Sequence, residues 1–162
     1  MFLSENDFTF GVSILPLVSI DLCIISPAYK ILLVKRNSRP ARNFYFTPGG
    51  RIRKNESIPE ALNRIAKEEI GLERLIELNP LLMGAWDHFY ADSAFAVDVS
   101  THYVNLPHFV ILSDQQIQEL NIKYGSNCQH DSYIWMDLLD TTKNIDVHHY
   151  SKLYAEYILK HF

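Results

Sequence analysis

The sequence predicts a single α/β domain, spanning residues 1–162, in which a mixed sheet is flanked by helices on both sides. A chain of 162 residues has the usual length of one domain and buries about 70% of its unfolded surface. Hydrophobic residues make up 48% and charged residues 21% of the chain, which is typical of globular proteins and not of disordered ones. Strand-like and helical segments alternate without a strict βαβ rhythm, and this favours a mixed sheet.

The first fifty residues are expected to form a short helix followed by strands. Ser4 has the character of a helix cap, with the acidic Asp7 three residues later, and the helix is expected to run to about Gly11. Apolar segments rich in β-branched or aromatic residues then predict strands at 17–25, 30–35 and 44–47. Pro27 supplies a turn between the first two strands.

A second helix is expected to begin after Ser57. Ser57 and Glu60 form a capping-box pattern, and Pro59 is tolerated in the first turn. Apolar residues recur at helical spacing at Ile58, Ala61, Leu62 and Ile65. Gly71 ends the helix, where a left-handed residue is favourable.

The second half of the chain predicts further strands and two helices. Strands are expected at 81–90, 102–112 and 133–136, a short helix at 113–120, and a polar loop at 121–130. Asp146 is expected to cap a last amphipathic helix, whose apolar face holds Val147, Tyr150, Tyr154 and Tyr157. These tyrosines are interpreted as core residues or a dimer face, and His148 and His149 as surface residues.

Charge and cysteine content restrict the class of protein. Fifteen Lys and Arg against nineteen Asp and Glu give a net charge of −4, which disfavours a nucleic-acid or anionic-membrane binder. Residues 35–54 nevertheless hold seven basic residues and no acid, a segment suited to one diphosphate. Cys23 and Cys128 are expected to be free thiols, and the N-terminus lacks the basic region of a signal peptide, so a cytoplasmic protein is expected.

The segment from Gly49 to Leu72 carries the clearest chemical signal. A glycine pair precedes a helix on which Ile65, Glu68 and Glu69 are three and four residues apart and share one face. Carboxylates beside a backbone carbonyl suit a hard cation such as Mg²⁺ or Mn²⁺. Taken alone, the same residues fit an ordinary solvated acidic patch equally well.

The spacing of this segment resembles the Nudix box, which is a glycine, five residues, a glutamate, seven residues, then Arg-Glu-aliphatic-x-Glu-Glu-x-Gly-aliphatic. The matching residues are Gly50, Glu56, Arg64, Glu68, Glu69, Gly71 and Leu72. Ile65 stands where the family usually has a glutamate. Such a degenerate box is found in the GDP-mannose mannosyl hydrolases, which the chain also resembles at 16–21, 35–41, 46–51, 86–90, 100–104 and 129–131.

The resemblance implies a Nudix-type α/β/α sandwich and a Mg²⁺-dependent hydrolysis of GDP-mannose or GDP-glucose to GDP and free sugar. Water would attack the anomeric carbon with inversion. The Gly49 carbonyl, Glu69 and Gln129 would hold one Mg²⁺, for which Mn²⁺ could substitute, and His130 would be the general base. Substrate contacts are implied for Asp21, Arg36, Arg51, His88, Tyr90 and Tyr103. Among these, Arg36 and Arg51 would clamp the diphosphate and Tyr103 would meet the leaving phosphate. The resemblance also implies a homodimer.

Glu68 leaves two alternatives open. The subfamily has a small residue there, so a carboxylate could recruit a second metal and restore attack on phosphorus, as in a nucleotide-sugar pyrophosphatase. A domain that binds a nucleotide sugar without turning it over is the second alternative. Arg64 is expected to be structural, pairing with Glu56 or Glu68. The loop at 121–128 is expected to be mobile without ligand.

Overall fold

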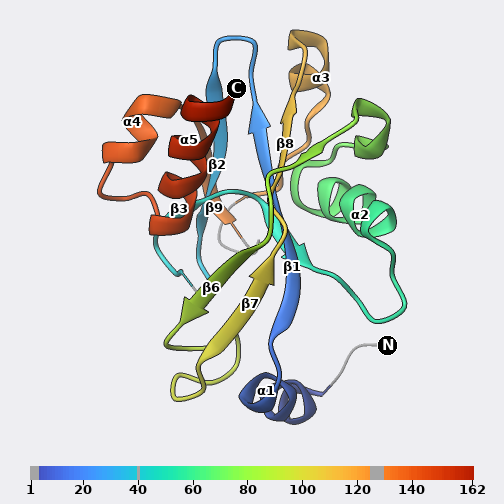
Figure 1. Cartoon of the computed structure of the whole chain (residues 1–162), viewed down its shortest axis with the longest axis vertical. Helices are drawn as coiled ribbons and strands as arrows, with labels where there is room; N and C mark the ends of the chain where they lie inside the picture. The colour runs from blue at the N-terminus through green and yellow to red at the C-terminus, as the bar shows by residue number, and fades with distance from the viewer. Residues whose placement is uncertain (1–3, 40, 125–129) are drawn as a thin grey trace.

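The computed structural model describes residues 4–39, 41–124 and 130–162 and shows a mixed sheet between two layers of helices (Figure 1). α4 (Leu138–Lys143) and α5 (His149–His161) cover one side of the sheet, and α2 (Ile58–Ile70) and α3 (Asp114–Glu119) lie on the other. The predicted fold class is therefore confirmed. Gln129 and Cys128, with residues 125–127 of the loop expected to be mobile, lie outside the described residues.

The first strand, β1 (Leu17–Ile25), is the centre of the sheet. It pairs antiparallel with β2 (Lys30–Arg36) and β4 (Gly49–Arg51), and parallel with β7 (Thr101–Asn105) and β8 (His108–Ile111). Because both kinds of pairing meet on one strand, the sheet is mixed. β1 also has the predicted bounds, as its apolar run suggests.

The remaining strands extend the sheet from these partners. β3 (Tyr45–Phe46) and β9 (His130–Asp137) both pair antiparallel with β2. β6 (Trp86–Tyr90) pairs antiparallel with β7, and β5 (Leu81–Leu82) with β8. The β2–β9 pairing joins residues that lie about a hundred positions apart, and it places a late strand of the chain beside an early one.

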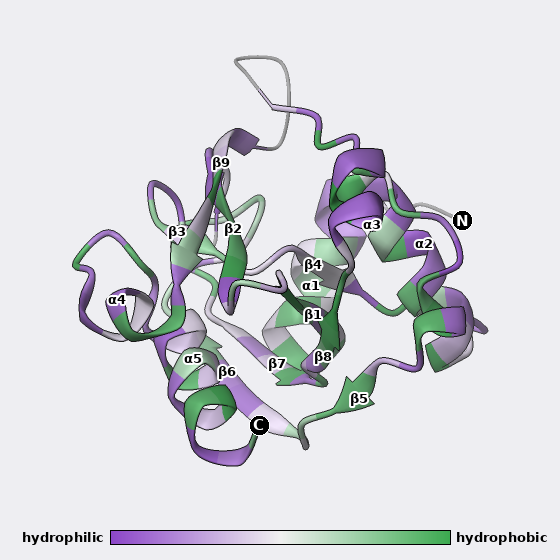
Figure 2. Ribbon diagram, turned by 90° about the horizontal axis from the view of Figure 1, so that it is seen from above, coloured by the Kyte–Doolittle hydropathy of each residue, from purple (hydrophilic) through white to green (hydrophobic). Residues whose placement is uncertain are grey.

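The sheet separates two apolar clusters. Side chains alternate between the faces of a strand, so Ile20, Leu22 and Ile24 pack towards α2, whereas Cys23 and Ile25 pack towards α5. The strands between the helix layers are correspondingly apolar in Figure 2. Cys23 is a buried free thiol, as expected.

The helix caps follow the local sequence. Ser57 and Glu60 form the predicted capping box of α2, and Gly71 ends that helix at φ +70°. Ser4 caps α1 (Glu5–Ile14), which runs three residues beyond the expected end, and Ser113 caps α3. Within the described part of the chain, no helix is both long and apolar enough to span a membrane.

Two predicted strands are each divided in the structure. The segment 81–90 contains β5 and β6, separated around Gly84, whose φ of +126° bends the backbone. The segment 102–112 contains β7 and β8, separated at Leu106 and Pro107, because proline lacks the N–H that a continuous ladder needs. β1 is the parallel partner on both sides of the second break, whereas β5 pairs with β8 and β6 pairs with β7.

The C-terminal region differs from expectation in three ways. α4 was not predicted, and Asp137 caps it by accepting a hydrogen bond from the backbone N–H of Leu139. α5 is capped by His148 and not by Asp146. His148 is not a surface residue, because its ring is half-buried and lies 5.0 Å from that of Phe46. His149 is exposed, as expected.

Candidate functional site

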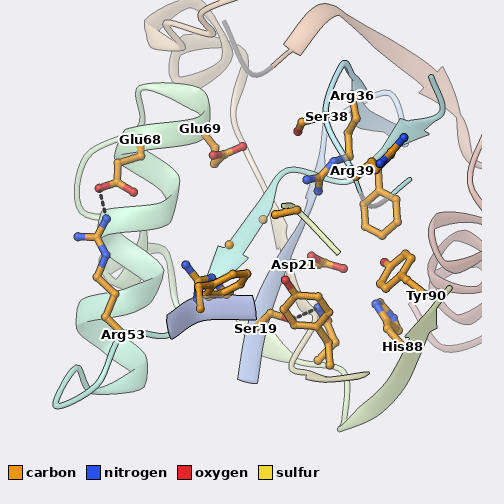
Figure 3. A pocket seen from close by; sticks show the side chains of 18 of the residues that line it. Ser19, Asp21, Arg36, Ser38, Arg39, Arg53, Glu68, Glu69, His88 and Tyr90 are labelled. Atoms are coloured by element: carbon orange, nitrogen blue, oxygen red, sulfur yellow. Dashed lines mark hydrogen bonds and ion pairs between the residues drawn. The ribbon is translucent and has the colours of Figure 1, made fainter. Parts of the chain in front are cut away.

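A pocket of about 570 Å³ opens between α2 and the strands that surround β1 (Figure 3). The expected site residues that line it are Asp21, Arg36, Gly49, Arg51, Glu68, Glu69, His88, Tyr90 and Tyr103. Figure 3 shows Glu69 on one side of the pocket and Asp21, His88 and Tyr90 on the other. The fold thus brings together residues that were predicted from separate segments.

Arginines form the basic part of the pocket. Arg36, at the end of β2, has a buried Nε with no hydrogen-bond partner among the described residues. A buried donor of this kind is costly unless a ligand or water satisfies it. The Arg51 guanidinium lies 4.3 Å from the ring centroid of Phe8, and Arg39 forms an ion pair of 3.5 Å with Asp92 at the rim. The pocket therefore offers an unsatisfied cation to an anionic ligand.

Glu69 is the carboxylate of α2 that points into the pocket (Figure 3). Its Oε2 lies 2.7 Å from His130 Nε2, and the side chains are only 13% and 5% exposed. His130 is the first residue of β9 and pairs with Arg36 just past a shift in the β2–β9 register, so it belongs to the sheet and not to the predicted loop. Its Nδ1 is buried without a partner among the described residues, and the ring does not line the pocket.

Glu68 points away from Glu69 in Figure 3 and is held by two arginines, of which the figure labels Arg53. Arg53 donates to Glu68 Oε1 at 3.2 Å, and Arg64 donates to Oε2 at 2.9 Å. Arg64 also pairs with Glu56, whose pKa it lowers through hydrogen bonding. The structural role expected for Arg64 is therefore observed with both carboxylates.

The glycine pair brings the backbone close to β1 and α2. A Cβ on Gly49 would lie 2.3 Å from Asp21 Oδ1, and one on Gly50 would lie 3.2 Å from Ile65 Cγ1. Ile65 is buried in the core, whereas Glu68 is exposed to solvent. The helical spacing had predicted that the two side chains lie on the same face of the helix. The box position that usually carries a glutamate is thus used for packing.

The donor set determines which metal ion the site could hold. Glu69 and Gly49 both line the pocket, and the carboxylate of the first and the backbone carbonyl of the second are hard oxygen donors. The described residues contain no group of three or more His, Cys, Asp and Glu that could hold a metal. Mg²⁺ often takes one or two protein carboxylates and completes its shell with water and phosphate oxygens. The chemistry of this set therefore fits one Mg²⁺ bound together with an anionic ligand.

The wall opposite Glu69 is a buried polar network. The Tyr154 hydroxyl, from α5, lies 2.8 Å from Asp21 Oδ2, 2.8 Å from His88 Nε2 and 3.0 Å from Asn105 Oδ1. Burial raises the pKa of Asp21 to about 7, although the Tyr154 hydrogen bond opposes this. Sequence reasoning placed Tyr154 only in a core or dimer face, and it missed Asn105.

Aromatic rings complete this wall. His88 stacks on Tyr150 with 3.6 Å between ring centroids, and burial lowers the pKa of His88 to about 3, so the ring is neutral. Tyr90 and Tyr103 meet edge to face at 6.1 Å. Burial raises the pKa of both phenols, so they remain hydrogen-bond donors.

Comparison with known sequences gives a family and two relatives. The model of the NUDIX domain family matches residues 15–157. The low-salt glycan biosynthesis protein Agl8 of Haloferax volcanii is 38% identical over 114 residues, which is 70% of either chain. An ADP-ribose pyrophosphatase of Methanocaldococcus jannaschii is 42% identical over 57 residues, or 35% of this chain and 33% of that protein.

Comparison with solved structures supports the fold. A MutT protein from Methanosarcina mazei Go1 superposes with a TM-score of 0.69 and 18% identity, covering 90% of this chain and 95% of that chain. The NUDIX domain of Shewanella oneidensis NrtR, crystallised with ADP ribose, gives a TM-score of 0.67 at 16% identity and covers 98% of both chains. At these identities the likeness concerns the arrangement of helices and strands.

Proposed function

Because the chain belongs to the NUDIX domain family, we propose that it hydrolyses GDP-mannose or GDP-glucose to GDP and free sugar. Water attacks the anomeric carbon, the bond between that carbon and the phosphate oxygen breaks, and the configuration inverts. The reaction depends on Mg²⁺. Among the relatives, the one at 38% identity is named for glycan biosynthesis, which supports a substrate that contains a sugar.

The observation that carries this proposal is that Glu69 is the α2 carboxylate that points into a pocket also lined by Arg36, whose buried Nε has no partner among the described residues. Glu69 points into the pocket, whereas Ile65 lies in the core and Glu68 is held by arginines. This leaves few carboxylates to assemble several metals around a phosphorus atom. The same pocket exposes Arg36 and Arg51 to a diphosphate. A site of this kind is better suited to stabilising a leaving diphosphate.

Different residues of the pocket have different roles towards the diphosphate. Negative charge develops on the diphosphate as the bond to the sugar breaks, and the Arg36 and Arg51 guanidiniums stabilise it. The Tyr103 phenol donates a hydrogen bond to the same group. Glu69 and the Gly49 carbonyl, with Gln129 from outside the described residues, would hold a Mg²⁺ that neutralises the diphosphate further.

His130 is proposed as the general base. A neutral imidazole that donates its Nε2–H to Glu69 keeps a lone pair on Nδ1, the nitrogen without a partner among the described residues. In this structure Nδ1 is buried and the ring does not line the pocket, so accepting a proton from the attacking water requires a rearrangement on ligand binding that brings the ring to the pocket. The hydrogen bond to Glu69 fixes the ring, as carboxylates do for other functional histidines.

Attack on phosphorus is the second candidate, and the match to an ADP-ribose pyrophosphatase favours it. Hydrolysis of GDP-mannose, GDP-glucose and ADP-ribose in ¹⁸O-water with Mg²⁺ separates the two reactions. We expect the label in the free sugar from the GDP-sugars. Label mainly in phosphate would establish the pyrophosphatase and overturn attack on carbon.

A catalytic function also has to be distinguished from binding alone. We expect His130→Gln to lose turnover by at least tenfold while keeping ligand affinity, because removing a general base costs about 10²–10⁴-fold in rate. His161→Gln, which changes an exposed histidine on α5, is the matched control. If the wild-type protein binds GDP-sugars but turns none of them over, it is a binding domain.

A further inference from the structure

One side chain of the C-terminal helix contacts the wall of the pocket from behind. Tyr154 is fully buried on α5 and does not line the pocket. Its hydroxyl contacts Asp21 of β1, His88 of β6 and Asn105 of β7, which all line it. Four separate elements therefore meet at a single oxygen atom.

The number of available protons limits how this network can be arranged. A tyrosine hydroxyl donates one hydrogen bond and accepts two. Asn105 Oδ1 only accepts, so the three contacts are all satisfied when Tyr154 donates to Asn105 and accepts from His88 Nε2–H and from a protonated Asp21. Asn105 Nδ2 donates to Ser19 Oγ at 2.8 Å, and its Oδ1 therefore faces Tyr154. Since each buried group is satisfied by another member, turning one side chain would leave a second without a partner. The network thus favours one orientation for every member.

Asp21 is restrained from two directions. Its Oδ2 is hydrogen-bonded to Tyr154, and its Oδ1 lies so close to Gly49 that an added Cβ there would be 2.3 Å away. The carboxyl group consequently has little freedom to rotate. Arg36 and Arg51 are not hydrogen-bonded to the Tyr154 hydroxyl, so the basic part of the pocket is held by other contacts.

We propose that Tyr154 is a positioning residue of this site, and that its hydroxyl sets the orientation in which Asp21, His88 and Asn105 meet the ligand. The identification of the ligand as a nucleotide sugar rests on the proposed function. The contacts of the Tyr154 hydroxyl are independent of that proposal. Removing the hydroxyl should weaken the binding of those parts of the ligand that are not the diphosphate. It should leave the arginine contacts unchanged.

The test compares Tyr154→Phe with Tyr157→Phe, which removes a hydroxyl three residues along the same helix. We expect Tyr154→Phe to lower kcat/KM for GDP-mannose by at least tenfold and to leave the Kd for inorganic pyrophosphate within twofold of wild type. Tyr157→Phe should change neither value more than twofold. An equal loss of pyrophosphate binding would show general damage to the fold and overturn the proposal. So would a Tyr154→Phe chain that fails to fold while Tyr157→Phe folds.

A double-mutant cycle shows whether Tyr154 acts through Asp21. If it does, the variant that combines Asp21→Asn with Tyr154→Phe should have a kcat/KM for GDP-mannose within about twofold of that of the worse single variant, because the effects of coupled residues are not additive. Losses that multiply would mean independent roles and overturn the proposal.

An NMR readout separates failure of this inference from failure of the proposed function. We expect the ¹⁵N resonances of the His88 imidazole to shift in Tyr154→Phe and not in Tyr157→Phe, without any substrate present. Unchanged His88 resonances would overturn the positioning role. Absence of turnover of every nucleotide sugar by the wild-type protein would instead overturn the proposed function.

Discussion

His130 Nε2 lies 2.7 Å from Glu69 Oε2, and this hydrogen bond joins residues that are 61 positions apart in the sequence. Glu69 belongs to the last turn of α2, and His130 is the first residue of β9. The proposed base and the proposed metal ligand are therefore in direct contact. A glutamine at position 130 can still donate a hydrogen bond to Glu69, which is why His130→Gln is expected to keep ligand affinity.

Glu69→Gln should weaken Mg²⁺ binding at least tenfold and lower turnover by a similar factor or more, because the site loses its pocket-facing carboxylate. Binding can be followed with Mn²⁺ by electron paramagnetic resonance. Glu77→Gln, which changes an exposed glutamate, should bind Mn²⁺ like wild type. Chelation with EDTA should abolish wild-type turnover, and added Mg²⁺ should restore it. Full activity in EDTA would contradict a metal-dependent reaction.

Arg36→Ala should raise the Kd for GDP about 10- to 100-fold, since a hydrogen bond to a charged group contributes about 1.5–3 kcal/mol. The affinity is measured by calorimetry in the presence of Mg²⁺. Arg42→Ala is the control, because it removes an exposed arginine from the same basic segment that does not line the pocket. Similar losses in both variants would indicate a general charge effect and not a specific contact.

The pH dependence of stability should reflect His88. Its folded-state pKa of about 3 is below the unfolded value of 6.5, so the unfolded chain takes up the proton first. The contribution of His88 is therefore present above pH 6.5 and is lost as the pH falls towards 3, at about 1 kcal/mol per pH unit. Urea unfolding between pH 7 and 4 should show a shallower decline for His88→Gln than for wild type or His161→Gln. Parallel curves would contradict a buried neutral His88.

Asp21 should make the stability depend on pH in the opposite direction to His88. Its folded-state pKa of about 7 is above the unfolded value of 3.8, so its contribution is greatest below pH 3.8 and is lost as the pH rises through 7. The stability of Asp21→Asn relative to wild type should therefore increase from pH 4 to pH 8, by an amount on the order of 3 kcal/mol. Asp98→Asn, at an exposed loop position, should show no such trend. A difference that stays constant with pH would mean that Asp21 ionises normally.

The glycines differ sharply in the space around them. Gly49→Ala should lower the free energy of unfolding by about 1–3 kcal/mol, because the new Cβ would overlap Asp21 Oδ1 and the Ile20 carbonyl oxygen. Gly11→Ala, inside α1, adds a Cβ that lies more than 4 Å from the rest of the described structure outside that helix's backbone, and it should instead raise this free energy by about 0.5–1 kcal/mol. Thermal unfolding of both variants checks the pair. Equal shifts would contradict a close approach at Gly49.

Local patterns predicted much of the fold. The apolar run of β1 and the capping box of α2 determined the bounds of both elements, because their signals lie within the elements themselves. Gly84 and Pro107 were visible in the sequence, yet both strands were predicted as continuous. The two segments still pair with each other on both sides of their breaks, β5 with β8 and β6 with β7, so the apolar pattern resembles that of two uninterrupted strands.

The candidate site was predictable where a motif spans it and not where contacts are long-range. The glycine pair and Glu69 belong to one motif, and the structure places both in the pocket wall. Tyr154 has the helical spacing of a core residue and no local sign of polar partners, because these lie 133, 66 and 49 residues away. The half-burial of His148 likewise depends on aromatic rings from other segments.

The position of β1 has a consequence for synthesis on the ribosome. This strand emerges early, but its parallel partners β7 and β8 and the helix that carries Tyr154 emerge much later. Pairing over such separations is slow, since the chain must close long loops before it gains the contacts. A nascent chain that already contains the whole Nudix box would therefore still lack a finished pocket. It would gain ligand affinity only after α5 has left the exit tunnel.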